Sequence, residues 1–399
     1  MKDGPLTGLK VVDLSRVLAG PFCSMNLGDM GADVIKVERP DGGDDTRSFG
    51  PPFHRGVSTY YLAINRNKRS IAVDLKHPEG KAILWSLLED ADILLENFRP
   101  GTLDRLGFDY ATCKAHNPRL IYCSISAFGH FGTPEWSQKP GYDLIIQGMG
   151  GIPSITGDPK GSPSKVGASI ADVVAGMNAF TGILLALFAR ERSGMGQKVD
   201  TSMLDGQVSL LTYLATAWLN TGKVPPRLGN RHLSIAPYST FEAADGWLNI
   251  AVANEKLWAC FCQAIHRDDM CDDPRFSTNA NRVENVDALD TELSQILGTD
   301  SVEAWIERLT AAGIPAGPVL TIDQVLQHAQ LLARGMLPTM THPTAGEIHL
   351  TGSPHYLTET PGSIRRPPPR LGEHTTEVLL ETGATEGDIQ RLKENGVVA

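Results

Sequence analysis

The chain has 399 residues, of which 41% are hydrophobic and 21% are charged, and its formal net charge is -10. That length exceeds one ordinary hydrophobic core, so two domains are expected. The acidic balance argues against a nucleic-acid partner, whose phosphates require a basic face. We also expect no membrane attachment, because no apolar run approaches the ~18 residues of a membrane span and no signal peptide is evident.

Cysteine and histidine usage predicts neither a disulfide framework nor a metal site. The six cysteines are scattered and form no CxxC pair, which is typical of reduced thiols in a cytoplasmic protein. The eleven histidines are equally dispersed, with no HExxH spacing. No bound metal is therefore expected.

Short β-branched runs alternate with helical stretches along the first half of the chain. The runs are residues 9–15, 32–38, 70–75, 91–96, 120–125 and 197–202, and helical stretches reach Gly31 and cover 78–90 and 203–219. Runs of this kind are typical of strands buried in a parallel sheet. The alternation predicts an α/β fold with a doubly wound parallel sheet and right-handed crossovers.

The second half begins with a different texture. Residues 223–237 are rich in turn residues and are predicted to be a linker. Residues 238–252 contain two strands of alternating pattern on either side of an Ala-Asp-Gly turn, which predicts an antiparallel hairpin. Helices are expected at 256–265, 282–297 and 301–312, and Ile314–Pro318 begins a return segment. Strands near 339–342 and 347–350 and a final helix follow. The predicted division is a large domain at 1–222, the linker, a small α+β domain at 238–325, and a return segment at 326–399 that completes the large domain.

The loop after the first strand argues against a dinucleotide cofactor. It offers a single glycine, Gly20, where a dinucleotide enzyme carries G-x-G-x-x-G, so an NAD(P)-dependent oxidoreductase is a weak alternative. Basic residues recur near successive strand ends, at Arg39, Arg47, Lys68, Arg69, Lys76, Arg99, Arg105 and Lys139. Each alone is typical of a solvated surface charge. Together they favour a ligand with several phosphates, such as coenzyme A.

One carboxylate stands in a small, apolar, glycine-rich stretch, residues 166–182. This is Asp172, and burying it is costly unless it is hydrogen-bonded or has a chemical role. Ser169-x-x-Asp172 also fits a helix-start capping box, in which Asp172 bonds back to the Ser169 N–H. The local sequence by itself favours the cap, and both readings are compatible because a helix N-terminus favours an ionised carboxylate.

The ordered motifs resemble those of the class III CoA-transferases, the superfamily of formyl-CoA and carnitine CoA-transferases. They include GLKVVDLS from Gly8, LAGPF from Leu18, GADVIKVERP from Gly31, GDDTR from Gly43, NRNKRSI from Asn65, ENFRPGTLDRLGF from Glu96, GYDLIIQ from Gly141 and GNRH from Gly229. HPTAGEI from His342 and RPPPRLGEHTT from Arg366 resemble dicarboxylate-using members, such as succinate–hydroxymethylglutarate and acetyl-CoA:oxalate CoA-transferases.

The resemblance implies a Rossmann-like large domain, a small domain and an interlinked homodimer. It implies that Asp172 is catalytic, and that substrate is bound by Leu18, Ala19, Arg39, Val73, Asp74, Leu75, Lys76, Asn97, Phe98, Arg99, Arg105, Lys139 and Tyr142. Asp143 lies beside the reacting centre, and Asn254 and Glu255 belong to a loop, residues 252–255, that covers the active site. Formyl-CoA transferases have a glycine-rich loop there and a glutamine at the position of Leu18, so this chain departs from them.

The expected activity is transfer of CoA from an acyl-CoA, with succinyl-CoA favoured, to a free dicarboxylate through intermediates on Asp172. CoA thioesters are the substrates, and no further cofactor is expected. Arg16, Arg47, Arg231 and His232 are the candidates for holding a second carboxylate. The alternatives are an α-methylacyl-CoA racemase and a non-catalytic acyl-CoA-binding protein. The racemases have a histidine at the position of Tyr142, and tyrosine is a poor base near neutral pH.

Overall fold

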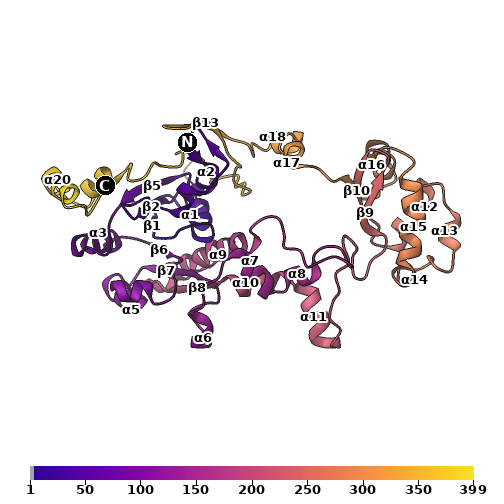
Figure 1. The fold of residues 1–399 in the computed structure, drawn as a ribbon, viewed down its shortest axis with the longest axis horizontal. Helices are drawn as coiled ribbons and strands as arrows, with labels where there is room; N and C mark the ends of the chain where they lie inside the picture. Colours follow the sequence, from indigo (N-terminus) through magenta and orange to yellow (C-terminus); the bar gives the residue numbers. More distant parts are fainter. Residues whose placement is uncertain (1–3) are drawn as a thin grey trace. The chain divides into compact units, whose positions relative to one another are not determined.

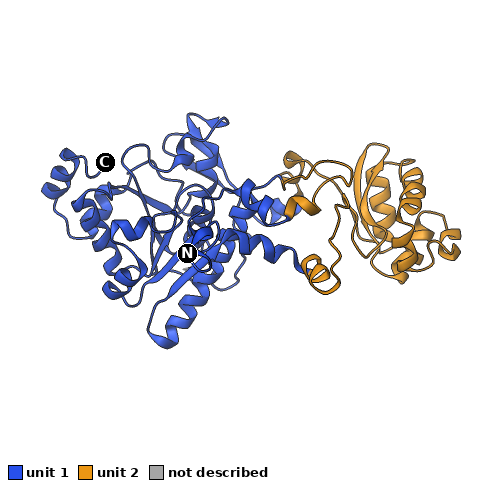
Figure 2. Ribbon diagram, turned by 60° about the horizontal axis from the view of Figure 1, so that its bottom comes forward, with its two compact units in different colours: residues 1–151, 167–212, 329–399 blue, residues 152–166, 213–328 orange. Residues whose placement is uncertain are grey.

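The computed structural model describes residues 4–399, which form two compact units. Unit 1 comprises residues 1–151, 167–212 and 329–399, and unit 2 comprises residues 152–166 and 213–328 (Figure 2). Segments 152–166 and 213–222, which stood in the first domain of the sequence-based division, group with unit 2. The larger unit is therefore assembled from three separate stretches of the chain.

A six-stranded parallel sheet forms the centre of unit 1 (Figure 1). Its strands lie in the order β5-β2-β1-β6-β7-β8, and each neighbouring pair is parallel. The bounds are β1 (Lys10–Asp13), β2 (Asp33–Glu38), β5 (Lys68–Ala72), β6 (Ile93–Glu96), β7 (Ile121–Ser126) and β8 (Lys198–Ser202). The predicted strands and the doubly wound, Rossmann-like sheet are confirmed. The strand order reverses between β1 and β6, where sheets of this type bind their ligands.

Helices cover both faces of the sheet (Figure 1). Helices α1 (Ala19–Asp29) and α9 (Ile170–Ser193) pack on one face, and α3 (Pro78–Glu89), α5 (Tyr110–His116), α19 (Thr375–Glu381) and α20 (Glu386–Glu394) enclose the core on the other. Val378 and Leu392 are buried in this second core. The final helices thus belong to the first unit.

Helices α1 and α9 approach one another so closely that glycine is required at their contact. A β-carbon at Gly176 of α9 would lie 2.5 Å from the carbonyl oxygen of Ala19. A β-carbon at Gly20 would likewise lie 2.2 Å from the β-carbon of Ser15. The small residues of the 166–182 stretch therefore let α9 lie against the start of α1, next to the loop that follows β1.

Helix α9 has the length and composition of a membrane span, with a mean hydropathy of 1.8. This differs from the expectation that no apolar run reaches that length. Its residues Ala175, Ala179 and Ile183 are fully buried in the core of unit 1. Packing of α9 against α1 and the sheet accounts for the apolar residues on its buried side, whereas Leu185 and Phe188 of the same helix are exposed.

Shorter elements complete unit 1. They are a 3-10 helix at Asp45–Ser48, β3 (Phe53–His54), β4 (Val57–Ser58), α2 (Thr59–Ile64), α4 (Thr102–Leu106), α6 (Pro134–Ser137), α7 (Asp143–Met149), α10 (Met203–Leu210), α18 (Ala329–Ala333), β12 (Thr339–His342) and β13 (Gly346–His349). The single helix predicted at 203–219 is wrong. The chain forms α10 and then α11 (Thr212–Thr221), because Thr212 adopts a φ of 40° that interrupts a continuous helix.

Unit 2 packs helices on a small antiparallel sheet in the order β11-β10-β9. Its elements are α8 (Ile152–Ile155), β9 (Tyr238–Ala243), β10 (Gly246–Ala251), α12 (Glu255–Ala264), α13 (Asp269–Asp272), α14 (Asn279–Glu284), α15 (Val286–Leu297), α16 (Val302–Ala311), β11 (Ala316–Pro318) and α17 (Ile322–Val325). The predicted hairpin is confirmed. Residues 316–318, at the start of the expected return but within the predicted small domain, pair with β10 as the third strand.

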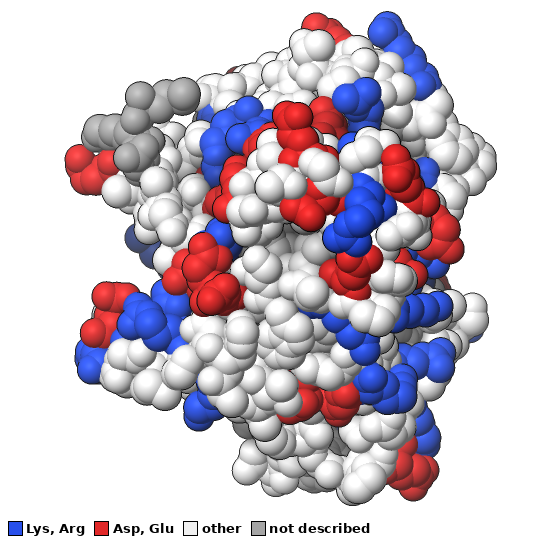
Figure 3. Space-filling model, turned by 90° about the vertical axis from the view of Figure 1, so that its left-hand side faces the viewer, with Lys and Arg blue, Asp and Glu red and all other residues white. Residues whose placement is uncertain are grey.

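Charged side chains of both signs are interspersed on the face of unit 1 that carries α3, α5 and α20 (Figure 3). Blue and red side chains alternate there, and neither sign forms one broad continuous area. A basic ligand site on this face would therefore be built from a few local residues.

A fully buried charge network lies beneath the loop that follows β1. The Lys36 ammonium lies 2.8 Å from an oxygen of Asp44 and donates a 2.8 Å hydrogen bond to the carbonyl oxygen of Ser15. Lys68 donates to the carbonyl oxygen of Pro21 at 2.9 Å and lies 3.5 Å from Asp13. Although burial opposes ionisation of Asp44, Lys36 lowers its pKa to about 2. The network ties the loop backbone to the interior of the sheet.

Removing one partner of this network is expected to be strongly destabilising. Lys36→Met leaves Asp44 buried without its cation, so the free energy of unfolding should fall by about 3–5 kcal/mol. The matched control is Lys10→Met, because Lys10 pairs at the surface with Asp90 and should change stability by less than about 1 kcal/mol. Urea unfolding of both variants measures the difference, and equal losses would contradict the prediction.

Candidate active site

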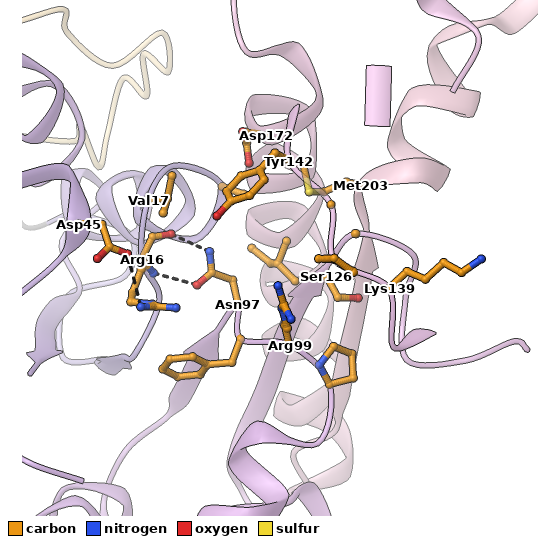
Figure 4. Close-up of a pocket in the computed structure, with 17 residues that line it drawn as sticks. Arg16, Val17, Asp45, Asn97, Arg99, Ser126, Lys139, Tyr142, Asp172 and Met203 are labelled. Atoms are coloured by element: carbon orange, nitrogen blue, oxygen red, sulfur yellow. Dashed lines mark hydrogen bonds and ion pairs between the residues drawn. The ribbon is translucent and has the colours of Figure 1, made fainter. Parts of the chain in front are cut away.

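Two hydrogen bonds join the loops that follow β1 and β6. The backbone N–H of Arg16 donates to the side-chain oxygen of Asn97 at 2.8 Å, and the Asn97 amide donates back to the Arg16 carbonyl oxygen at 2.7 Å (Figure 4). Asn97 directly follows β6 and Arg16 lies three residues after β1. The side chain of Asn97 therefore fixes the backbone from which the Arg16 side chain extends.

Val17, the next residue, is held in an unfavourable backbone conformation. Its φ is 67°, a left-handed region that β-branched residues rarely adopt. Its N–H points to a carboxylate oxygen of Asp44 at 3.3 Å, which links it to the buried network. Strain of this kind persists only where the surroundings enforce it, and it concentrates at functional sites.

Asp172 shares a cavity of about 170 Å³ with residues from the strand ends. Arg16, Val17, Asn97, Arg99, Tyr142 and Met203 are among the residues that line it (Figure 4). The sequence-predicted residues Ala19, Phe98 and Lys139 also line this cavity. The structure thus brings Asp172 together with loops that are far apart in the sequence.

The start of α9 is capped by a residue that the local sequence did not indicate. Ser169 is the N-cap residue, but its side chain makes no capping hydrogen bond. Asp143 of α7 instead accepts a 2.9 Å hydrogen bond from the N–H of Ala171, and its other oxygen accepts from the Gln147 amide at 2.8 Å. The predicted capping box is therefore wrong, because a carboxylate from another helix occupies the position of the cap.

Burial and a neighbouring carboxylate change the ionisation of Asp172. Desolvation, followed by the charge of Asp143, raises the pKa of Asp172 to about 7. This corrects the expectation that the helix terminus favours the ionised form. Near neutral pH the Asp172 side chain is thus divided between acid and carboxylate, an environment typical of functional carboxyl groups.

Tyr60 of α2 is a neighbour of this site that the sequence reasoning missed. Burial, followed by the charges of Asp172 and Asp143, raises the pKa of Tyr60 to about 12. Its phenol is therefore a hydrogen-bond donor at neutral pH. Residues 59–64 read as an ordinary short helix, and no local motif distinguishes Tyr60.

A second cavity of about 310 Å³ lies beside the first, and both are lined by Arg16 and Phe98. The predicted substrate-binding residues Arg39, Val73, Asp74, Leu75, Lys76 and Arg105 all line the second cavity. Residues from the ends of four separate strands thus meet around one space. Its mixture of cationic side chains and aliphatic walls suits an anionic ligand with a flat or apolar part.

Several predicted residues have local partners instead. Arg47 donates to both oxygens of Glu38, at 2.8 and 2.7 Å, and Lys139 pairs with Glu135 while lying 3.5 Å from the Trp136 ring centroid. Leu18 is the N-cap residue of α1. In unit 2, Asn254 caps α12 and Glu255 pairs with Arg282 at 2.9 Å.

Residues 4–399 contain no group of three or more histidine, cysteine or acidic side chains that could hold a metal. The chemistry available in the first cavity is that of one perturbed carboxyl group, a phenol and nearby cations. A carboxylate in such surroundings can act as a nucleophile or as a base.

The α/β fold has its candidate site, the cavity beside Asp172, at the switch point of the sheet. A model of CoA-transferase family III matches residues 6–375. The chain therefore belongs to CoA-transferase family III, and the predicted enzyme class is confirmed.

Curated relatives match nearly the whole chain. A succinyl-CoA:glutarate CoA-transferase of Mus musculus is 40% identical over 395 residues, covering 99% of this chain and 90% of that protein. A succinate–glutarate CoA-transferase of Agrobacterium fabrum is 42% identical and covers 96% of both. An acetyl-CoA:oxalate CoA-transferase of Acetobacter aceti is 40% identical, covering 96% of this chain and 97% of that protein.

Solved structures show the same fold. A CAIB/BAIF family protein from Brucella suis has a TM-score of 0.85 and 39% sequence identity, covering 96% of this chain and 100% of that one. The Rv3272 protein of M. tuberculosis also has a TM-score of 0.85, with 30% identity over 95% of this chain and 100% of that one.

The raised pKa of Asp172 predicts that this residue reduces stability. The folded state holds the Asp172 proton more tightly than the unfolded state does, so ionisation costs stability as pH rises from about 4 through 7. Asp172→Asn removes this cost. The free energy of unfolding should rise by roughly 1–3 kcal/mol at pH 8, and by less at pH 5. Urea unfolding at both values measures the gain, and a gain that is larger at pH 5 would contradict the sign.

Proposed function

We propose that this enzyme moves CoA from succinyl-CoA to a free dicarboxylate, with Asp172 as the covalent nucleophile. The observation that carries the proposal is the position of Asp172. It is a partly desolvated carboxyl group in a cavity that adjoins a larger one lined by cationic residues. The names of the relatives support the substrate class, because they act on succinyl-CoA with glutarate or on acetyl-CoA with oxalate.

The first half of the reaction transfers CoA to the enzyme. A carboxylate oxygen of Asp172 attacks the thioester carbonyl of succinyl-CoA, and the carbon–sulfur bond breaks. CoA thiolate departs, and a mixed anhydride between Asp172 and succinate is formed. The thiolate then attacks the Asp172 carbonyl of this anhydride. Succinate departs as a carboxylate, and Asp172 is left as an aspartyl-CoA thioester.

The second half repeats these steps with the acceptor. A carboxylate oxygen of the incoming acid attacks the aspartyl thioester and displaces CoA thiolate. The thiolate attacks the acceptor carbonyl of the new anhydride, which forms the product thioester and restores the Asp172 carboxylate. One thioester replaces another, so neither ATP nor a metal nor a further cofactor is required. Water must be excluded, because it would hydrolyse every intermediate.

The larger cavity is the proposed site of the nucleotide part of CoA. Arg39, Lys76 and Arg105 lie around it and supply charge for the phosphates, whereas Val73 and Leu75 supply apolar walls. Phe98 and Arg16 lie at both cavities, so the pantetheine arm would pass between them toward Asp172. Remote contacts of this kind hold the thioester in place through successive exchanges.

We propose further that the enzyme is an interlinked homodimer in the cytoplasm. Large apolar side chains of unit 1 are exposed on α9 and α10, including Leu185, Phe188, Val208 and Leu210. Apolar residues exposed in this number are typical of a surface that another subunit covers. Light scattering of the purified protein should give twice the mass of one chain.

Removing the nucleophile is expected to abolish transfer and to spare binding. Asp172→Ala should reduce transfer of CoA from succinyl-CoA to glutarate by at least about 1,000-fold, because the proposed anhydride forms on the Asp172 carboxylate. CoA affinity, measured by calorimetry, should change by less than about 3-fold. Mass spectrometry of the intact wild-type protein with succinyl-CoA should detect CoA attached to Asp172.

Transfer that survives in Asp172→Ala would contradict the mechanism. A racemase would instead exchange the α-proton of a branched acyl-CoA with deuterated water in the absence of any acceptor acid. A binding protein would bind CoA and catalyse neither reaction.

The pH dependence should report the Asp172–Asp143 pair. Activity of the wild type should rise with pH through about 7, because only the carboxylate form of Asp172 attacks. Asp143→Asn removes the neighbouring charge while an amide oxygen still caps α9, so the acid limb should move about 1 pH unit lower. Glu89→Gln, an exposed change on α3, controls for net charge and should leave the limb in place. An unchanged limb in Asp143→Asn would refute the coupling.

A further inference from the structure

A dicarboxylate has a second carboxylate that must be held while the first one reacts, and the structure discriminates among the four candidate cations. Arg47 is engaged by both oxygens of Glu38 and by the Tyr61 hydroxyl at 2.6 Å. Its guanidinium also donates to the carbonyl oxygen of Pro369 at 3.2 Å. Arg47 is therefore a structural residue, with little capacity left for a ligand.

The two candidates in unit 2 are also engaged. Arg231 pairs with Asp287 at 2.7 Å and with Asp290 at 2.6 Å. The His232 ring lies against the rings of Tyr213 and Tyr238, with centroids 5.5 and 5.3 Å away. Contacts within unit 2 therefore already hold both side chains.

Arg16 differs from these three in both position and bonding. It lines the Asp172 cavity, and 43% of its side chain is exposed. Its backbone is fixed on both sides by Asn97, and its guanidinium lies 5.4 Å from the centroid of the Phe98 ring. Pre-organisation of this kind lowers the entropic cost of binding a ligand.

The guanidinium of Arg16 already lies beside a carboxylate, but the contact is weak. Its only ion pair within residues 4–399 is with Asp45, at 3.4 Å. The other oxygen of Asp45 accepts a 2.9 Å hydrogen bond from Arg39. A long and solvent-accessible ion pair of this kind contributes little to stability. A ligand carboxylate that forms a bidentate pair with the guanidinium can therefore replace it.

The cavity has two other cations, Arg99 and Lys139. Lys139 is paired with Glu135, and its side chain extends away from the other lining residues (Figure 4). Arg99 is exposed, and the described residues provide no hydrogen-bond partner that orients its guanidinium. Arg16 is therefore the best-ordered cation in this cavity that retains free donors.

We propose that Arg16 reads the second carboxylate of the acid, and so makes this enzyme select dicarboxylates over monocarboxylates of equal length. The inference rests on the proposed function. The departing succinate and the entering acceptor would occupy the same place in turn, each with its distal carboxylate on the Arg16 guanidinium. In the structure, an Asp45 oxygen lies 3.4 Å from that guanidinium.

The test compares glutarate with pentanoate, which has five carbons and one carboxylate, using succinyl-CoA as the donor. The readout is the ratio of the two kcat/KM values, in which effects on the shared donor half-reaction cancel. Arg16→Gln should lower this ratio by about 10- to 100-fold, because a charged hydrogen-bonding partner is lost. Arg16→Lys should recover part of the ratio, since it keeps the charge without the planar fork.

Arg99→Gln is the matched control, because it removes a second arginine from the same cavity. Its ratio should stay within about 3-fold of the wild type. Calorimetric titration with free CoA separates the two ligands, since Arg16→Gln should keep its CoA affinity if Arg16 reads the acid.

The outcomes separate this inference from the proposed function. The role of Arg16 would be overturned if Arg16→Gln kept the wild-type ratio of kcat/KM values, or if that ratio fell in Arg99→Gln instead. Either result would leave the proposed function standing. Loss of CoA binding in Arg16→Gln with an unchanged ratio would assign Arg16 to the nucleotide and overturn it equally. A wild-type enzyme that transfers CoA to no dicarboxylate would overturn the proposed function together with this inference.

Discussion

The close approach of α9 to the start of α1 is the constraint on which the site depends. Only a hydrogen at Gly176 allows the backbone of Ala19 to lie against α9, since a β-carbon would be 2.5 Å from its carbonyl oxygen. This contact brings the first turn of α9, with Asp172, beside the loop after β1. The buried ions Lys36 and Asp44 then fix that loop from below. A helix contact and a charge network together position one carboxyl group next to Arg16 and Val17.

The electrostatics of the site oppose ionisation of Asp172 and so reduce stability. Asp143 caps α9 through the N–H of Ala171, and its charge also opposes ionisation of Asp172. A carboxyl group with a pKa near 7 is held in place here by packing, whereas water would stabilise its anion better. Natural proteins often accept such local costs where function requires them. Carboxyl groups with a raised pKa of this kind are typical of functional sites.

Local sequence patterns predicted the strands of the sheet correctly and the capping of α9 wrongly. The difference is whether the structure depends on neighbouring residues or on distant ones. Buried parallel strands are encoded in short apolar runs, so all six strands could be recognised. A cap can come from any neighbouring chain segment, and Asp143 is 29 residues before Asp172 in the sequence. Tyr60 was missed for the same reason, because it comes close enough to feel the charge of Asp172 only in the folded unit. The break at Thr212 and the pairing of residues 316–318 with β10 also depend on tertiary context.

The sequence by itself determined the fold class, the order of the strands along the chain and the membership of CoA-transferase family III. Periodicity and ordered motifs carry this information, and they need no knowledge of distances. The tertiary structure alone decided which cations remain available, because ion pairs form between residues that are distant in sequence. Arg47 is engaged by Glu38, and Arg231 by Asp287 and Asp290, whereas Arg16 keeps donors free in the cavity of Asp172. The sequence shows which residues are charged, but folding decides which of them form ion pairs.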